Sequence, residues 1–289
     1  MSTSLRLLRQ YQIRPRRRLS QSFLTDDAAF LKIVAACHLQ QEDTVVEIGA
    51  GLGVMTAMLA KKAGKVFAIE VDPALIPVLQ QNMDRQDRVT IVNMDVLKYD
   101  FAEAAREETG EKIRVIGNIP YHITSEILFR LLTFARIIHS AVLLMQKEVA
   151  ERITALPGTK AYGIPTVILG MYADVEKLFD VPNRSFYPVP AVDSSVVRIV
   201  FRDKPRFDLN DETFFQTVVR TAFARRRKTL LNNLKALSQI QEKADHLGSF
   251  LDGLGIDGNR RAESLTLAEF AILSNALHSA KTPEKNTPE

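Results

Sequence analysis

Short apolar segments typical of β-strands alternate with amphipathic, helix-like segments over the first two-thirds of this chain. The β-branched run Thr44–Ile48, for example, is followed by a helix-like run from Val54 to Lys62. Strands and helices alternating at this spacing form right-handed β-α-β units, which build mostly parallel sheets with helices on both faces. The sequence therefore predicts an α/β fold. Its expected strands are Thr44–Ile48, Lys65–Glu70, Val89–Met94, Ile113–Gly117, Ile138–Met145, Val175–Val181 and Ser195–Phe201.

The pattern changes toward the end of the chain. Only a Pro-rich stretch at 182–190 separates the last two expected strands, which predicts an antiparallel pair at one edge of the sheet. Beyond residue 205, apolar residues recur at helical spacing, and Thr266 with Glu269 three residues later forms a capping box. We expect four parts: a basic N-terminal arm at 1–20, the α/β domain at 21–205, an all-helical domain at 206–281 and a disordered tail at 282–289.

Cysteine usage and hydropathy favour an intracellular protein without a membrane span. Cys37 is the only cysteine among 289 residues, so no internal disulfide can form and nothing favours an oxidising compartment. The apolar stretches Ile137–Gln146 and Ala161–Ala173 fall short of the roughly 18 residues that a membrane-spanning helix needs. We therefore expect a cytoplasmic protein that does not associate with membranes.

Positive charge gathers in two clusters, near residues 14–18 and at 225–228. The net charge of +4 says little alone, but Lys and Arg clusters are suited to neutralising phosphates. Each cluster could instead be a solvated face, and the Arg-rich first 18 residues would also fit an organellar transit peptide. The candidate RNA-binding residues are Arg16, Arg17, Arg18, Arg225, Arg226, Arg227 and Lys228.

Polar and glycine residues stand where three neighbouring expected strands end. Gly49-Ala50-Gly51-Leu52-Gly53 follows the first strand, and its glycines let the backbone turn tightly against a ligand. Glu70 ends the second strand, where a carboxylate can accept both ribose hydroxyls of an adenosine cofactor, and Asp95 after the third could accept from the adenine amine. Both NAD and S-adenosylmethionine fit this much. Val54 stands where a dinucleotide fingerprint would place its third glycine.

The fourth expected strand ends in Gly117-Asn118-Ile119-Pro120-Tyr121. The Asn118 side-chain oxygen and the Ile119 or Pro120 carbonyl could accept hydrogen bonds from an exocyclic amine, favouring the pyramidal nitrogen of a methyl-transfer transition state. Tyr121 could stack on an unstacked target base. This turn therefore favours methyl transfer to adenine over nicotinamide chemistry.

Taken in order, these motifs resemble the ribosomal RNA adenine dimethyltransferase family, whose best-known bacterial members confer kasugamycin sensitivity. The resemblance covers nearly the whole chain. Its segments are Gln21–Leu24, Val46–Gly53, Ile69–Asp72, Asp95–Leu97, Gly117–Tyr121, Gln146–Arg152, Lys160–Gly163 and Phe186–Ser194.

The resemblance implies a Rossmann-like class I methyltransferase with a seven-stranded sheet and a helical domain that contacts RNA. It implies dimethylation at N6 of two adjacent adenosines in the 3′-terminal hairpin of small-subunit ribosomal RNA, with S-adenosylmethionine as cofactor, no metal, and an immature subunit as partner; nothing demands more than a monomer. Ser22 stands where the family usually has Asn, which puts an amide contact there in doubt. The implied catalytic residues are Asn118, Pro120, Tyr121 and Phe186, the last against the other face of the adenine. The implied cofactor-binding residues are Ser22, Leu24, Glu47, Gly49, Gly51, Glu70, Asp95 and Asn118.

Three alternatives stay open on the sequence. A sister enzyme could act on large-subunit RNA, as macrolide-resistance methyltransferases do, although the helical domain and the Phe186–Ser194 segment lean against it. A non-catalytic assembly or transcription factor could use the same fold, although the intact Asn118–Tyr121 turn favours catalysis. A nicotinamide dehydrogenase is disfavoured by Val54.

Overall fold

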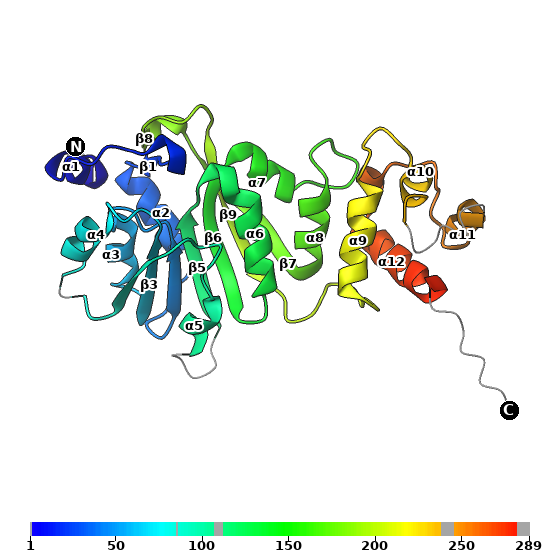
Figure 1. The fold of residues 1–289 in the computed structure, drawn as a ribbon, viewed down its shortest axis with the longest axis horizontal. Coiled ribbons are helices and arrows are strands. Elements are labelled where there is room, and N and C mark those ends of the chain that lie inside the picture. Colours follow the sequence, from blue (N-terminus) through cyan, green and yellow to red (C-terminus); the bar gives the residue numbers. More distant parts are fainter. Residues whose placement is uncertain (1, 85, 107–111, 238–245, 282–289) are drawn as a thin grey trace. The chain divides into compact units, whose positions relative to one another are not determined.

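The computed structural model describes residues 2–84, 86–106, 112–237 and 246–281, and their fold is shown in Figure 1. The predicted disordered tail at 282–289 lies outside the described residues. Backbone contacts divide the chain into two compact units, residues 1–151 with 174–203 and residues 152–173 with 204–289. The sequence prediction set one boundary at residue 205 and expected 152–173 in the first domain, whereas these residues cluster with the second unit.

The first unit is built on a seven-stranded sheet of order β4-β3-β2-β5-β6-β9-β7. The neighbours β4–β3, β3–β2, β2–β5 and β5–β6 are parallel, while β9 is antiparallel to β6. The predicted mostly parallel, seven-stranded sheet is therefore confirmed. The strands are β2 Thr44–Ile48, β3 Lys65–Glu70, β4 Val89–Asn93, β5 Ile113–Asn118, β6 Ile138–Gln146, β7 Ala173–Val181 and β9 Ser194–Phe201.

Strand order reverses beside β2. From β2 the chain winds outward through β3 and β4, and it then returns to add β5 and β6 on the other side of β2. In open α/β sheets, ligands bind at the carboxyl ends of the strands at such a reversal. The topology therefore predicts a ligand-binding site at the carboxyl ends of β2 and β5.

The last two strands of the sheet are neighbours, with β7 at the edge. Arg198 pairs with Glu176 at 2.6 Å, and Arg202 pairs with Asp174 at 2.9 Å. Because the partner's number falls as the arginine's number rises, β9 and β7 run antiparallel, as the sequence predicted.

The helices of the first unit flank this sheet (Figure 1). A separate two-stranded ribbon pairs β1 (Phe23–Leu24) with β8 (Phe186–Tyr187) in antiparallel fashion. The helices are α1 Thr3–Gln10, α2 Asp27–Ala36, α3 Val54–Leu59, α4 Ile76–Asn82, α5 Phe101–Arg106, α6 Thr124–Thr133 and α7 Lys147–Ile153, the last of which crosses the boundary between the units.

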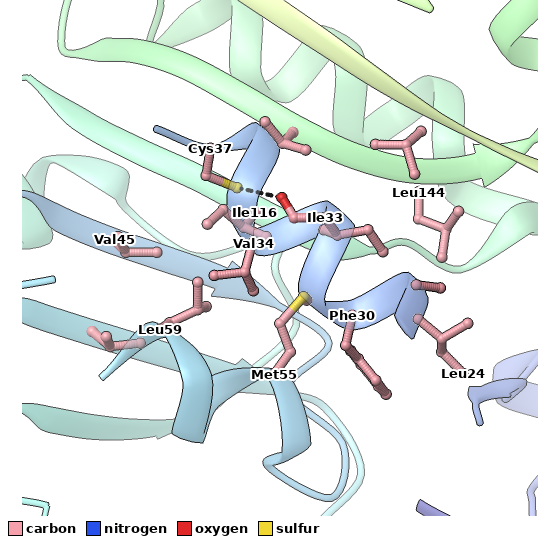
Figure 2. Close-up of a cluster of buried hydrophobic side chains, with 14 of the residues drawn as sticks. Leu24, Phe30, Ile33, Val34, Cys37, Val45, Met55, Leu59, Ile116 and Leu144 are labelled. Carbon is pink, nitrogen blue, oxygen red and sulfur yellow. Dashed lines mark hydrogen bonds between the residues drawn. The ribbon is translucent and has the colours of Figure 1, made fainter. Parts of the chain in front are cut away.

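Helix α2 buries one face against the sheet (Figure 2). Asp26 caps the helix by accepting from the amides of Ala28 and Ala29. Ile33 and Val34 are 1% and 2% exposed and pack in one apolar cluster with β2, α3 and β5. Burying an aliphatic side chain of this size contributes ~1.5–3 kcal/mol, so this cluster, which also includes Leu24 of the ribbon, holds α2 in place.

The second unit is helical in its described part. Helix α9 (Glu212–Ala222) contacts α8 (Ile164–Tyr172), α10 (Leu230–Leu234) and α12 (Leu267–Lys281), and α11 spans Leu247–Gly253. The apolar face predicted for α9 is buried. No helix among the described residues is long and apolar enough to cross a membrane.

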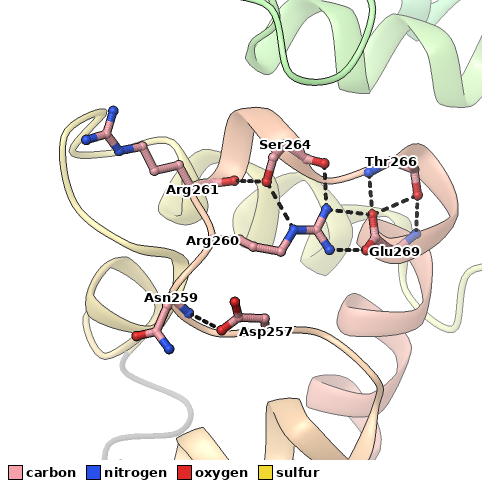
Figure 3. Close-up of polar contacts among 7 residues, drawn as sticks. All are labelled: Asp257, Asn259, Arg260, Arg261, Ser264, Thr266 and Glu269. Atoms are coloured by element: carbon pink, nitrogen blue, oxygen red, sulfur yellow. Dashed lines mark hydrogen bonds and ion pairs between the residues drawn. The ribbon is translucent and has the colours of Figure 1, made fainter.

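The predicted capping box of α12 is present (Figure 3). Glu269 accepts from the amide of Thr266 at 2.7 Å, and the Thr266 hydroxyl accepts from the amide of Glu269 at 3.2 Å. Arg260 pairs with the same carboxylate and donates to the Ser264 carbonyl at 2.6 Å. The ion pair with Arg260 lowers the pKa of Glu269, so this carboxylate stays charged and ties the preceding loop to the start of α12.

Candidate functional site

A pocket opens at the carboxyl ends of β2, β3, β4 and β5, in the first unit. The space inside it that admits water amounts to about 110 Å³. The N-terminal segment 19–23 forms one wall, and the strand ends form the others. The predicted site residues among its lining are Ser22, Gly49, Gly51, Glu70, Asp95, Asn118, Pro120 and Tyr121.

The glycine turn after β2 brings two strand ends close together. Gly49 has a φ of +74°, and its amide donates to the Ile69 carbonyl at 2.9 Å. A Cβ at Gly49 would lie 3.3 Å from the Asn118 carbonyl oxygen. Glycine is needed here both for its backbone conformation and for the narrow gap between the turn and β5.

Glu70 holds the turn from the neighbouring strand. Its Oε2 accepts from the Gly51 amide at 2.9 Å, and its Oε1 accepts from the Asp72 amide at 2.8 Å. Burial raises the pKa of Glu70, while these two amides act in the opposite direction. A carboxylate oxygen has more than one acceptor site, so both oxygens can still accept from a ligand while the backbone fixes their orientation.

The third strand end completes this side of the pocket. Asp95 accepts from the Leu97 amide at 3.0 Å through Oδ1, which fixes the carboxylate at the start of a turn. The neighbouring Met94 is 40% exposed and also lines the pocket. An apolar side chain beside a fixed acceptor suits a purine ring, whose face is apolar and whose amine is a donor.

Asn118 is oriented by the N-terminal segment. Its Nδ2 donates to the backbone carbonyl of Ser22 at 3.1 Å. Within the part of the chain that the structure describes, its Oδ1 has no hydrogen-bond donor, so this oxygen is the side chain's acceptor for a ligand. The Ser22 hydroxyl donates instead to the Pro188 carbonyl at 2.9 Å. The contact that residue 22 makes with Asn118 therefore comes from its backbone and does not need the family's usual Asn side chain.

The turn after Asn118 is equally constrained. The Tyr121 hydroxyl lies 2.6 Å from Oγ of Ser194, which is fully buried. Burial raises the pKa of Tyr121, so its ring remains a neutral phenol. The Pro120 carbonyl already accepts from the Thr124 hydroxyl and the Ile123 amide, both at 3.3 Å. Of the two backbone carbonyls suggested by the sequence, that of Ile119 is therefore better placed to accept from a ligand.

The N-terminal segment is fastened to the pocket through Asp72. Arg16 forms an ion pair with Oδ1 of Asp72 at 2.7 Å, and Gln21 donates to Oδ2 at 2.8 Å. Gln21 also accepts from the Arg16 amide at 2.8 Å. Arg16 was predicted to contact RNA, but its guanidinium is engaged within the protein. Arg17 and Arg18 are exposed.

Three predicted site residues do not line the main pocket. Leu24 and Phe186 are opposite one another in the ribbon, and they are 3% and 2% exposed within the apolar cluster under α2. As placed, the Phe186 ring cannot stack on a base, because apolar side chains cover it. Glu47 is 1% exposed behind the glycine turn, where Thr56 donates to its Oε2 at 2.5 Å.

Glu47 should make folding stability depend on pH. Burial raises its pKa to about 8, opposed by the Thr56 hydrogen bond and reinforced by the charge of Glu70. The folded protein therefore keeps a proton that the unfolded chain releases near pH 4.5. Stability should fall as the pH rises from about 4.5 to about 8, by up to ~1.4 kcal/mol per pH unit.

Denaturant unfolding between pH 5 and pH 9 measures this effect. Glu47→Gln should flatten the fall, whereas the same change at the exposed Glu42 should leave it intact. Identical pH profiles for the wild type and Glu47→Gln would show that Glu47 ionises normally.

The second basic cluster lies in the second unit. Arg226 pairs with Glu263 at 3.2 Å and donates to the Lys160 carbonyl. Arg225, Arg227 and Lys228 are exposed. Arg226 is exposed as well, but its guanidinium is engaged within the protein, whereas among the residues described no such contact is seen for its three neighbours.

Sequence reasoning assigned no role to Gln21, Asp72 or Ser194, although each lies in a motif that carried the resemblance. Each acts through a partner at least 51 residues away in the sequence. Burial of a polar residue just beyond a strand end, as for Asp72 at 2% exposure, marks a structural role of this kind only once the chain is folded.

The fold and the pocket define a Rossmann-like class I methyltransferase. The family model for ribosomal RNA adenine dimethylase matches residues 13–278, so the chain belongs to that family, as its resemblance predicted. Ribosomal RNA small subunit methyltransferase A of Syntrophus aciditrophicus is 44% identical over 271 residues, covering 94% of this chain and 97% of the relative. The protein of the same name from Bacillus mycoides is 42% identical and covers 94% of each chain.

Solved structures agree with this assignment. A dimethyladenosine transferase from Plasmodium falciparum superposes with a TM-score of 0.75 at 25% identity, covering 87% of this chain and 95% of that one. The 23S rRNA methyltransferase ErmE gives a TM-score of 0.68 at 26% identity, covering 89% of this chain and 99% of that one.

Proposed function

We propose that this chain dimethylates N6 of two adjacent adenosines in the 3′-terminal hairpin of small-subunit ribosomal RNA, using S-adenosylmethionine. The observation that carries the proposal is the position of Asn118. Its amide nitrogen is fixed on the Ser22 carbonyl and its oxygen remains an acceptor, at the same sheet edge as Gly49 and Glu70. The names of the two bacterial relatives support small-subunit RNA as the substrate.

The strand ends fit the proposed cofactor. Glu70 presents two oriented oxygens to a ribose, Asp95 presents an acceptor to the adenine amine, and the glycine turn leaves room for a ligand close to the backbone. When bound, the cofactor supplies a sulfonium methyl group. The other proposed cofactor residues are Ser22, through its carbonyl, and Gly51; Leu24 and Glu47 support the site from behind.

The Asn118–Tyr121 turn then holds the target base. The Asn118 oxygen and the Ile119 carbonyl accept from the two hydrogens of the N6 amine, which favours a pyramidal nitrogen and stabilises the positive charge that develops on it. Pro120 fixes the turn, and the Tyr121 ring stacks on a base that has left its RNA stack. The alkylated amine is acidic enough to lose its proton to water, so no side chain has to act as a general base.

The same proposal extends to binding partners. We propose that the chain acts as a monomer in the cytoplasm and binds an immature small ribosomal subunit. Arg17, Arg18, Arg225, Arg227 and Lys228 supply exposed positive charge for its phosphates.

Labelled S-adenosylmethionine tests the proposed function directly. Incubation with undermethylated 30S subunits, followed by nucleoside analysis, should yield N6,N6-dimethyladenosine. Uptake into 50S precursors and not into 30S subunits would identify a large-subunit enzyme instead. Binding to 30S subunits without methyl transfer would identify an assembly factor, and binding of a nicotinamide cofactor in titration would overturn the cofactor proposal.

The salt dependence of RNA binding tests the second basic cluster. If Arg225 contacts a phosphate, Arg225→Gln should reduce the slope of log K against log salt by about 0.7–0.9. Arg226→Gln is the matched variant, and it should change the slope less because its guanidinium is engaged by Glu263. An unchanged slope for Arg225→Gln would assign that residue to a solvated surface.

A further inference from the structure

Strand β8 and the loop that follows it expose three large apolar side chains within six residues. Tyr187 is 47% exposed, Val189 is 61% exposed and Val192 is 44% exposed. Single exposed apolar residues are ordinary on a protein surface, but several of them close together beside a functional site commonly mark a binding surface. We call Tyr187, Val189 and Val192 the apolar rim.

The apolar rim is held in place by a set of hydrogen bonds around it. Asn183 donates through its backbone amide to the Asp193 carboxylate at 2.9 Å and through its side chain to the Pro190 carbonyl at 3.1 Å. The Pro188 carbonyl accepts from Ser22 at 2.9 Å. Because these hydrogen bonds already order the loop, binding of a ligand there costs little conformational entropy.

Strand register places Tyr187 beside the pocket. Residues directly opposite in an antiparallel pair project to the same face of the ribbon, and Tyr187 is opposite Phe23, which lines the pocket. Leu24 and Phe186 form the next pair, which faces the core. The ribbon therefore buries Phe186 on one face and extends the pocket wall outward through Tyr187 on the other.

We propose that the apolar rim receives the base of the nucleotide next to the adenosine held in the pocket, with Tyr187 stacking on that base. This inference rests on the proposed function. Removing one adenosine from an RNA stack exposes the face of its neighbour, and aromatic side chains cover such faces in single-stranded RNA recognition.

The size and charge of the rim favour a base over a protein. Three side chains make a patch far smaller than the ~800 Å² that each partner buries in an ordinary protein interface. The exposed Arg184 lies three residues before Tyr187 and provides positive charge for a phosphate. The acidic residue in the loop, Asp193, accepts from Asn183.

Kinetics with undermethylated 30S subunits test the role of Tyr187. Tyr187→Ala should raise the KM for the subunit by about five- to 150-fold, the range that corresponds to base–aromatic stacking, with kcat and the Kd for S-adenosylmethionine nearly unchanged. Tyr187→Phe keeps the ring and should keep the KM. If Tyr187→Ala fails to fold, the double change Val189→Ser with Val192→Ser removes apolar surface from exposed positions and should raise the KM in the same direction.

Changes in the RNA identify the contact. Reconstituted 30S subunits would carry uridine in place of the nucleotide on either side of the methylated adenosine, because uracil stacks more weakly than a purine. On one side, this change should raise the KM of the wild type several-fold and that of Tyr187→Ala by less than twofold. The inference would be overturned if, on both sides of the methylated adenosine, the uridine change raised the KM of Tyr187→Ala by the same factor as that of the wild type. An unchanged KM for Tyr187→Ala would also overturn it. A wild type that transfers no methyl to any 30S subunit would instead overturn the proposed function.

Discussion

Replacing Asn118 with alanine is expected to lower the turnover number for adenosine methylation by about 10²- to 10³-fold, the usual cost of removing one preorganised polar group that stabilises transition-state charge. The substitution deletes the Oδ1 acceptor and the Nδ2 donor that binds the Ser22 carbonyl at 3.1 Å. The loss should fall on kcat, measured as initial methyl uptake into undermethylated 30S subunits at saturating cofactor and substrate.

Two further variants separate the roles of the Asn118 side chain. Asn118→Asp keeps an acceptor oxygen but places carboxylate charge against the Ser22 carbonyl, so an intermediate loss is expected. Asn259→Ala makes the same truncation at an exposed asparagine of the second unit and serves as the matched control. Near-normal turnover in Asn118→Ala would remove this residue from the mechanism, whatever the other variants do.

Much of the pocket could be predicted because strand ends are readable in sequence. Gly49, Glu70, Asp95 and Asn118 each stand at or just after the end of a β-branched run, and the carboxyl ends of parallel strands meet at one edge of a sheet. Local pattern therefore placed these four residues together before any packing was known. The family match then agreed with the same motifs.

Pairings across long stretches of sequence could not be read in this way. Arg16 resembles its neighbours Arg17 and Arg18, and nothing local to it reveals that Asp72, 56 residues later, holds its guanidinium. The two-residue strand Phe186–Tyr187 is likewise too short to show an alternation. Which of its two rings would be buried depended on pairing with Phe23–Leu24, whose register is a property of the folded chain.

Helices without a polar face were also missed. Helix α8, Ile164–Tyr172, is apolar over most of its length, and its sequence shows no helical period to detect. Helix α4 begins only at Ile76, because the Asp72 carboxylate accepts from the Ala74 amide and holds the preceding residues in a turn. Period-based prediction works only where one face of an element meets water.

Replacing Glu70 with alanine should raise the Kd for S-adenosylmethionine by about 10²- to 10⁴-fold. A carboxylate that accepts from two ribose hydroxyls would contribute two charge-assisted hydrogen bonds, each worth ~1.5–3 kcal/mol, and both are lost. Isothermal titration with the cofactor, in the absence of RNA, measures the change. Glu70→Gln keeps one oxygen but turns an NH₂ donor toward the Gly51 or Asp72 amide. This variant should therefore bind the cofactor more weakly than the wild type and more tightly than Glu70→Ala.

The charge of Glu70 adds a dependence on pH to the same titration. Burial raises the pKa of this carboxylate, and only its ionised form accepts from both hydroxyls while also accepting from the Gly51 and Asp72 amides. Affinity for the cofactor should therefore weaken as the pH falls toward the raised pKa, and this dependence should be absent in Glu70→Gln. Equal affinities of the wild type and Glu70→Ala for the cofactor across the pH range would show that the ribose binds elsewhere. The cofactor contacts proposed for the ends of β2, β3 and β4 would then have to be reassigned.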